Sequence, residues 1–87
     1  MTTAEKPDFE RVRELIVALT CKHYTVSPDE VTSDSNYSTD FRSDSLDFVE
    51  LIIGIEESLH ITIDDSVAFS SNVTVQQLTD TIWKLVS

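Results

Sequence analysis

Apolar residues recur every three or four positions in three long segments of the chain, which is the spacing of one buried helix face. The first segment covers about residues 8–22, and its apolar positions are Phe9, Val12, Ile16 and Leu19. The last segment has Val75, Leu78, Ile82 and Leu85, flanked by Trp83. Both patterns predict a helix with a single face turned to a common core.

The middle segment, about Ser45 to Leu59, carries more apolar residues than one buried face requires. A core-facing set consists of Leu51, Ile52, Ile55 and Leu59. A second stripe lies to one side and consists of Leu46, Val49 and Ile53, interleaved with Asp47, Glu50, Glu56 and Glu57. This stripe indicates either a wide apolar face or a surface that docks on partner proteins. Gly54 weakens the helix, so we expect a neighbour to pack closely there.

The connections between these helices are mostly polar, and no segment reads convincingly as a strand. Residues 24–43 form a long first loop containing one helical turn, which begins with the capping-box pattern of Ser27 and Glu30. A short helix is predicted from Asp64 to about Phe69, with Phe69 facing inward. A second capping box, Thr74 and Gln77, opens the last helix.

The fold class is therefore all-α: three main helices and one short helix joined as a bundle, with a long first loop. We expect residues 1–7 to be a flexible N-terminus and residues 8–87 to form one domain. The chain has 87 residues, which bounds it to a single small core. A core of that size leaves little room for an enclosed active site with several catalytic groups.

Negative charge is concentrated in the later part of the chain. Residues 27–87 hold twelve of the 16 acidic residues and only two basic ones, which accounts for the net charge of −10. Such a surface disfavours nucleic acid and anionic membranes and favours basic patches on proteins. The alternative is that the acidity only keeps the protein soluble and monomeric. The sequence shows neither a transmembrane run nor a signal peptide, so a cytoplasmic location is expected.

The tetrapeptide Asp44-Ser45-Leu46-Asp47 stands where the long loop meets the middle helix. By position alone Ser45 is an N-cap, with its hydroxyl accepting a backbone hydrogen bond. The other interpretation is an exposed hydroxyl that carries a phosphodiester, since helix N-termini favour anions.

The run from Asp40 through Ser45 to Leu51 resembles the prosthetic-group site of the acyl carrier proteins. The likeness extends over about residues 9–86 and includes Glu30-Val31-Thr32 and Tyr37 at the family's usual spacing. It implies an acyl-carrier-like four-helix bundle whose Ser45 bears a covalent 4′-phosphopantetheine, donated by coenzyme A through a phosphopantetheinyl transferase. The arm's thiol would hold acyl intermediates as thioesters, so the protein would be a carrier and not an enzyme.

The resemblance also implies partners: the transferase and acyl-loading, condensing or acyl-transfer enzymes of fatty acid, polyketide or related biosynthesis, with basic docking patches. The expected docking residues are Asp44, Leu46, Asp47, Val49, Glu50, Ile53, Glu56 and Glu57. Two other functions remain open at this point. One is a peptidyl or aminoacyl carrier of a nonribosomal system, and the other is a non-carrier interaction domain that uses the acidic helix.

Arg42 departs from the family, which usually has glycine at this position. Because arginine resists positive φ, we expect the loop to turn differently before Ser45. The arginine would also bring a cation near Ser45, where it could pair with the phosphodiester or with Asp44. No metal site is expected, because His23 and His60 lie far apart without a second ligand pattern.

Overall fold

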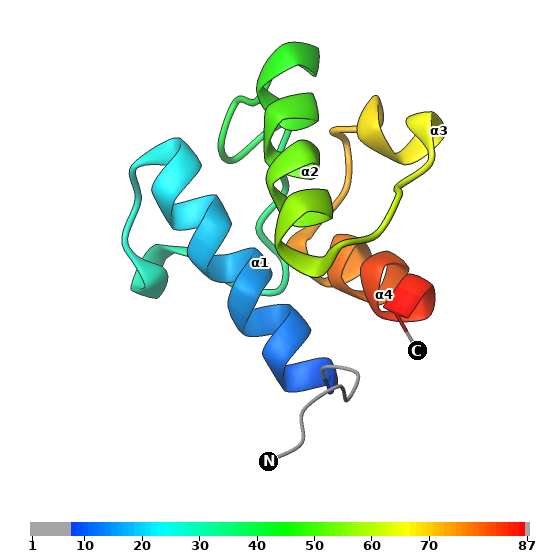
Figure 1. Cartoon of the computed structure of the whole chain (residues 1–87). Helices are drawn as coiled ribbons and strands as arrows, with labels where there is room; N and C mark the ends of the chain where they lie inside the picture. Colours follow the sequence, from blue (N-terminus) through cyan, green and yellow to red (C-terminus); the bar gives the residue numbers. More distant parts are fainter. Residues whose placement is uncertain (1–7, 87) are drawn as a thin grey trace.

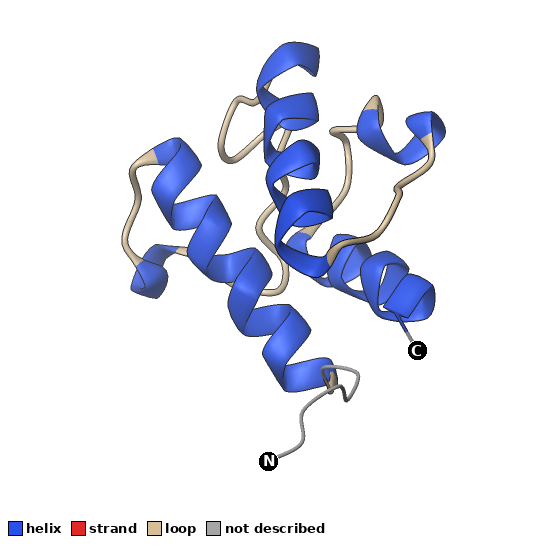
Figure 2. Ribbon diagram, in the orientation of Figure 1, coloured by secondary structure: helices blue, strands red, loops and turns tan. Residues whose placement is uncertain are grey.

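The computed structural model describes residues 8–86 as four α-helices and one 3₁₀ turn. The elements are α1 (Phe9–Tyr24), η1 (Pro28–Glu30), α2 (Ser45–Leu59), α3 (Asp65–Ala68) and α4 (Val75–Val86) (Figure 1). Figure 2 shows helices joined by loops, and within residues 8–86 the strand-type pairing is limited to an isolated bridge between Asn36 and Thr74. The predicted all-α bundle is confirmed. The predicted flexible segment, residues 1–7, lies outside the described residues.

Three of the helix starts use side-chain caps. The Asp8 carboxylate accepts the Arg11 N–H at 2.9 Å at the start of α1. At α4 the predicted capping box is present, since Thr74 Oγ1 accepts the Gln77 N–H at 3.1 Å and Gln77 Oε1 accepts the Thr74 N–H at 2.9 Å. Such caps satisfy amides that have no partner inside the helix. These local rules explain why the helix starts could be predicted closely.

The core forms where α1 packs against both α2 and α4. It is built from the inward faces predicted for the three main helices, with fully buried side chains that include Val12, Ile16, Ile55 and Ile82. In Figure 1, α2 lies between α1 and the short α3, and α4 crosses beneath them. No helix within residues 8–86 has the length and apolar character needed to cross a membrane.

The long first loop is anchored to the core through Tyr37. Its side chain is fully buried, and its hydroxyl lies 2.8 Å from the Thr20 hydroxyl. The Tyr37 N–H donates to the Val73 carbonyl at 3.0 Å, and its ring packs on that of Phe48 with centroids 5.3 Å apart. The loop therefore connects α1, the start of α2 and the start of α4, and it fixes where α2 begins.

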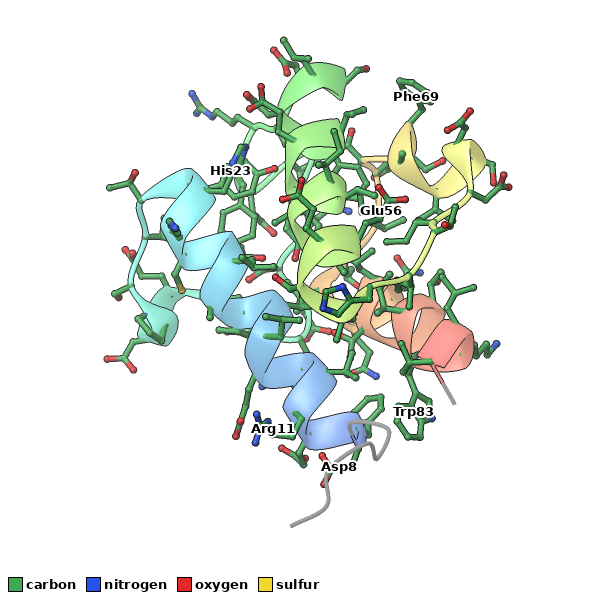
Figure 3. The ribbon with its side chains drawn as sticks, viewed as in Figure 1. Asp8, Arg11, His23, Glu56, Phe69 and Trp83 are labelled. Carbon is green, nitrogen blue, oxygen red and sulfur yellow. The ribbon has the colours of Figure 1, made fainter. Side chains whose placement is uncertain are left out.

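Two residues predicted to face inward are exposed, and those predictions were wrong. Phe69 is 63% exposed because α3 ends at Ala68, one residue before it, and only Ala68 of that short helix is buried. Leu85 is 48% exposed, and near this end of α4 it is Trp83 that packs against the core, with its ring 6.0 Å from that of Phe9 in an edge-on contact. Figure 3 shows Phe69 at the tip of α3, far from Trp83.

The close packing expected at Gly54 is also absent. A β-carbon added there would meet no atom within 4 Å among the described residues. Gly54 instead borders an open groove between α1 and α2. Nothing in the packing of the described residues requires a glycine at this position.

Candidate functional site

Ser45 is the first residue of α2, and its hydroxyl is not the helix cap. The cap is Asp44, whose Oδ1 accepts the Asp47 N–H at 2.8 Å. Ser45 is exposed, and within residues 8–86 its hydroxyl takes part in no hydrogen bond. The interpretation of Ser45 as an N-cap is therefore wrong. Because Asp44 does the capping, the Ser45 hydroxyl is left free at the positive end of the helix.

Ser43, two residues earlier, has the opposite environment. It is only 6% exposed, and its hydroxyl lies 2.6 Å from the Tyr24 hydroxyl. Its N–H donates to the Tyr37 carbonyl at 2.8 Å. The chain is thus fixed just before α2 by a buried serine, and the next serine projects into solvent.

The aromatic cluster beneath this loop holds the site in place. Tyr24 stacks on Phe41 with ring centroids 5.3 Å apart, and Phe41 lies 5.5 Å from Tyr37. Desolvation raises the pKa of the Tyr24 hydroxyl, the hydrogen bond to Ser43 lowers it, and the charges of Asp47 and Asp44 raise it further. The carboxylates of Asp44 and Asp47 therefore lie near enough to this cluster to act on Tyr24.

Arg42 adopts the left-handed conformation that the sequence led us to exclude. Its φ is 53°, so the loop turns as a glycine would allow, at some conformational cost to arginine. The side chain is exposed and forms no ion pair with Asp44 or any other residue of the described chain. The expectation of a different turn was wrong, and the cation is left available in solvent three residues before Ser45.

The outer face of α2 exposes the second apolar stripe. Leu46 is 66% exposed and Ile53 is 44% exposed, whereas Val49 between them is half-buried against the core. Glu50 and Glu57 are exposed beside this stripe, and Asp47 is half-buried. The structure therefore presents apolar side chains and carboxylates together on the helix that begins with Ser45.

Glu56, also predicted to dock partners, has a contact inside the protein. Its Oε2 accepts the Ile63 N–H at 2.7 Å, which attaches α2 to the extended connector that precedes α3. Figure 3 shows Glu56 on the side of α2 that faces this connector. The carboxylate thus satisfies a backbone donor, a role that the spacing of acids along α2 does not reveal.

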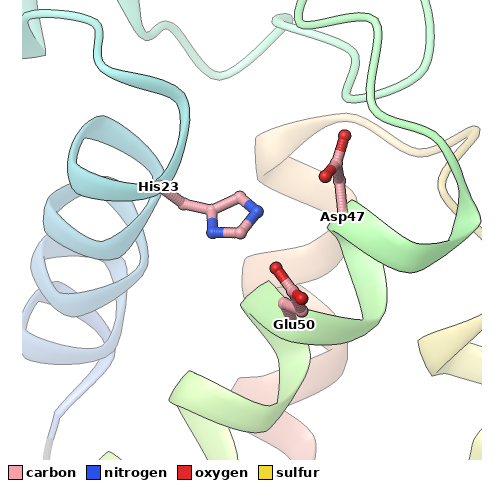
Figure 4. Close-up of side chains that lie close together, drawn as sticks. All are labelled: His23, Asp47 and Glu50. Atoms are coloured by element: carbon pink, nitrogen blue, oxygen red, sulfur yellow. The ribbon is translucent and has the colours of Figure 1, made fainter.

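One grouping was missed by sequence reasoning. His23 of α1 lies beside Asp47 and Glu50 of α2, and one potential ligand atom from each lies within 4.8 Å of the others (Figure 4). The three residues come from two helices, so no local spacing signals the approach of His23 to the two carboxylates. Their position is set by the packing of α1 on α2.

The geometry at Ser45 fits a covalently attached phosphopantetheine arm. An exposed hydroxyl is accessible to a modifying enzyme, and the free amides of the first helical turn favour a phosphodiester by about 0.3–1 kcal/mol. No side chain among the described residues engages this hydroxyl.

Comparison with known proteins agrees with this geometry. The family described as "Phosphopantetheine attachment site" matches residues 10–82. An acyl carrier protein of Sulfurovum sp. (strain NBC37-1) is 43% identical over 60 residues, which cover 69% of this chain and 75% of that protein. The chain therefore belongs to the acyl carrier protein family, whose membership implies a covalently attached 4′-phosphopantetheine.

Proposed function

We propose that this protein carries acyl intermediates as thioesters on a 4′-phosphopantetheine arm attached to Ser45. The observation that carries the proposal is the exposed Ser45 hydroxyl, which is free of hydrogen bonds within the described residues because Asp44 caps the helix. The arm, when attached, supplies the thiol that bears the acyl group. The protein itself supplies the attachment point and the surface that partners recognise.

Each residue around Ser45 has a separate role in this proposal. Asp44 holds the first turn of α2 through the Asp47 N–H and so keeps the serine exposed. The amides of that turn favour the phosphodiester, whereas the carboxylates of Asp44 and Asp47 repel it and direct the arm outward. Buried Ser43 fixes the incoming chain. The attachment point is therefore rigid although it lies beside a loop.

The outer face of α2 is the proposed docking surface. Leu46 and Ile53 would enter shallow apolar pockets on a partner, and Glu50 and Glu57 would meet its arginine and lysine rim. Val49 would contribute only the exposed part of its side chain. Glu56 would contribute less, because one of its carboxylate oxygens already accepts the Ile63 N–H. The expected partners are a phosphopantetheinyl transferase and the enzymes that load, extend or transfer acyl groups in fatty acid, polyketide or related biosynthesis.

Intact mass spectrometry tests the attachment directly. Incubation of the apo protein with coenzyme A and a broad-specificity transferase should add one phosphopantetheinyl unit to the wild-type chain and none to Ser45→Ala. Ser58→Ala is the matched control, because Ser58 is also an exposed serine of α2, and it should be modified like the wild type. A wild-type chain that gains no mass, or a Ser45→Ala variant that does, would overturn the proposal.

A further inference from the structure

We infer that His23, Asp47 and Glu50 form a binding site for a divalent transition-metal ion such as Zn²⁺, which would bridge α1 and α2. The site lies at the α1–α2 interface, and its donor set is one imidazole nitrogen and two carboxylate oxygens (Figure 4). Three protein ligands with solvent in the remaining positions is a common arrangement for zinc.

The geometry requires only small movements to close on an ion. The three candidate ligand atoms already lie within 4.8 Å of one another. Bonds of about 2.1 Å to a tetrahedral ion would place the ligand atoms about 3.4 Å apart. Glu50 is exposed and has a long side chain, so rotation about its side-chain bonds can supply most of this approach. His23 and Asp47 are half-buried and less free to move.

The charges at the site also favour a cation. Asp47 and Glu50 are three positions apart on one helix, where like charges repel each other. Neither carboxylate forms an ion pair with a basic residue of the described chain. A bound divalent ion would neutralise the two carboxylates together.

The imidazole is held in position by its surroundings. The His23 ring meets the Tyr24 ring edge-on, with centroids 4.7 Å apart and planes at 86°. Tyr24 is itself held by its hydroxyl, 2.6 Å from that of Ser43. The histidine is therefore the preorganised member of the set.

A groove gives an ion access from solvent. It has a volume of about 330 Å³ and is lined by Leu19, Lys22, His23, Glu50, Leu51 and Gly54. Gly54 leaves open space on this side of α2, since a β-carbon there would meet nothing within 4 Å. Room of this kind allows the ion to keep water molecules as its remaining ligands.

The donor set predicts which ions bind. Imidazole suits zinc, copper, nickel and iron, whereas calcium and magnesium prefer sites made of oxygen alone. Zn²⁺ should therefore bind more tightly than Mg²⁺. Because Asp47 and Glu50 also belong to the proposed docking surface, bound Zn²⁺ would weaken attraction to basic partners. That consequence rests on the proposed function, but the cation site itself does not.

The test uses the unmodified protein, so that no arm thiol is present, and the Cys21→Ser background, so that no thiol of the chain competes. Zn²⁺ titration by calorimetry should show one site, and ring NMR signals should shift for His23 and stay in place for His60, the other histidine of the chain. His23→Asn and Glu50→Gln should each weaken Zn²⁺ binding by at least about tenfold. Even the loss of a residue that only hydrogen-bonds a metal ligand commonly lowers the affinity by about that factor.

His60→Asn is the matched control. His60 ends α2 with a φ of 57°, a conformation that asparagine tolerates, so this variant should fold and bind Zn²⁺ like its parent. Circular dichroism of each variant separates lost binding from lost folding. The inference is overturned if a folded His23→Asn variant binds within about twofold of its parent, if His60 shifts in place of His23, or if Mg²⁺ binds as tightly as Zn²⁺. None of these readouts depends on Ser45 accepting an arm.

Discussion

The two helices α2 and α4 are both amphipathic, but they distribute their apolar residues differently. In α4 the fully or almost fully buried positions Val75, Leu78 and Ile82 form the core face, and Leu85 is the one large apolar side chain of this helix that is exposed. In α2 a similar buried stripe is accompanied by Leu46 and Ile53 in solvent. A single exposed apolar residue such as Leu85 is ordinary, whereas several on one helix face are typical of a contact surface.

The comparison teaches that the surface of α2 reflects a demand beyond stability. Its first residue is an exposed serine that does not cap the helix, and its middle contains a glycine that the packing does not require. Both helices are capped by the residue before them, Asp44 and Thr74, but the first residue of α4 is the fully buried Val75. This contrast is the basis of our proposal that the outer face of α2 serves recognition.

The largest expected difference in the free energy of unfolding is that between truncation of Ile82 on α4 and truncation of Ile53 on α2. Ile82→Ala should lower the free energy of unfolding by about 2–5 kcal/mol, because Ile82 is fully buried and its truncation leaves a cavity. Ile53→Ala should change it by less than about 1 kcal/mol, since surface substitutions usually have small effects. Urea denaturation of both variants measures the difference. Equal losses would show that the outer face of α2 is as important to the fold as α4.

Alkaline pH should lower the stability of the protein through ionisation of Tyr37, which anchors the long first loop to the core. Desolvation, partly offset by the hydrogen bond to Thr20, raises the pKa of Tyr37 from 10.0 to about 12. The unfolded chain loses this proton first, so full stabilisation is present below about pH 10 and is lost as pH rises to about 12, by roughly 2–3 kcal/mol. Unfolding monitored at several pH values tests this. Tyr37→Phe should flatten the dependence, and an unchanged slope would contradict the assignment to Tyr37.

The next largest contrast in stability is between removal of the Thr74 hydroxyl at the start of α4 and removal of the Ser45 hydroxyl at the start of α2. Thr74→Ala should destabilise the protein by about 1 kcal/mol, because Thr74 Oγ1 accepts the Gln77 N–H. Ser45→Ala should stay within about 0.5 kcal/mol of the wild type, because the Asp44 carboxylate caps α2. Thermal unfolding of the apo proteins is sufficient to compare them. If Ser45→Ala lost about 1 kcal/mol of stability, Ser45 would have to contribute to the cap of α2, which would contradict this account.

The smallest expected effect is a gain in stability on substitution of Gly54. Gly54→Ala should stabilise the protein by about 0.5–1 kcal/mol, because alanine restricts the unfolded chain and the added β-carbon meets nothing within 4 Å. Chemical denaturation resolves a change of this size when the two transitions have the same slope. A destabilised variant would mean that the groove beside Gly54 closes in solution.

The predictable features of the fold are those set by neighbours in sequence. Apolar spacing and capping patterns predicted α2 from Ser45 to Leu59 and the start of α4 at Val75, since both depend on local rules. The end of α1 was predicted at residue 22, whereas the helix continues to Tyr24 and ends where Thr25 adopts a φ of 57°. A left-handed threonine leaves no signature in the sequence, because its conformation is imposed by surrounding structure.

The candidate site was predictable only in part. The motif around Ser45 identified the family and led to the prediction that Ser45 is the attachment point, but it did not reveal that Asp44 is the cap. The approach of His23 to Asp47 was missed because it depends on the angle and register of two packed helices. The exposure of Phe69 was missed for the related reason that α3 stops one residue earlier than expected. These features are tertiary and have no local pattern.

The measurement that tests the division between α2 and α4 most directly compares two equally exposed apolar residues. Ile53 on α2 is 44% exposed and Leu85 on α4 is 48% exposed. Steady-state transfer of phosphopantetheine to Ile53→Ala should show kcat/KM reduced by about five- to tenfold, the loss of roughly 1 kcal/mol or slightly more of interface contact. Leu85→Ala should be modified at the wild-type rate, and equal effects of the two substitutions, or none from Ile53→Ala, would contradict the assignment of α2 as the recognition helix.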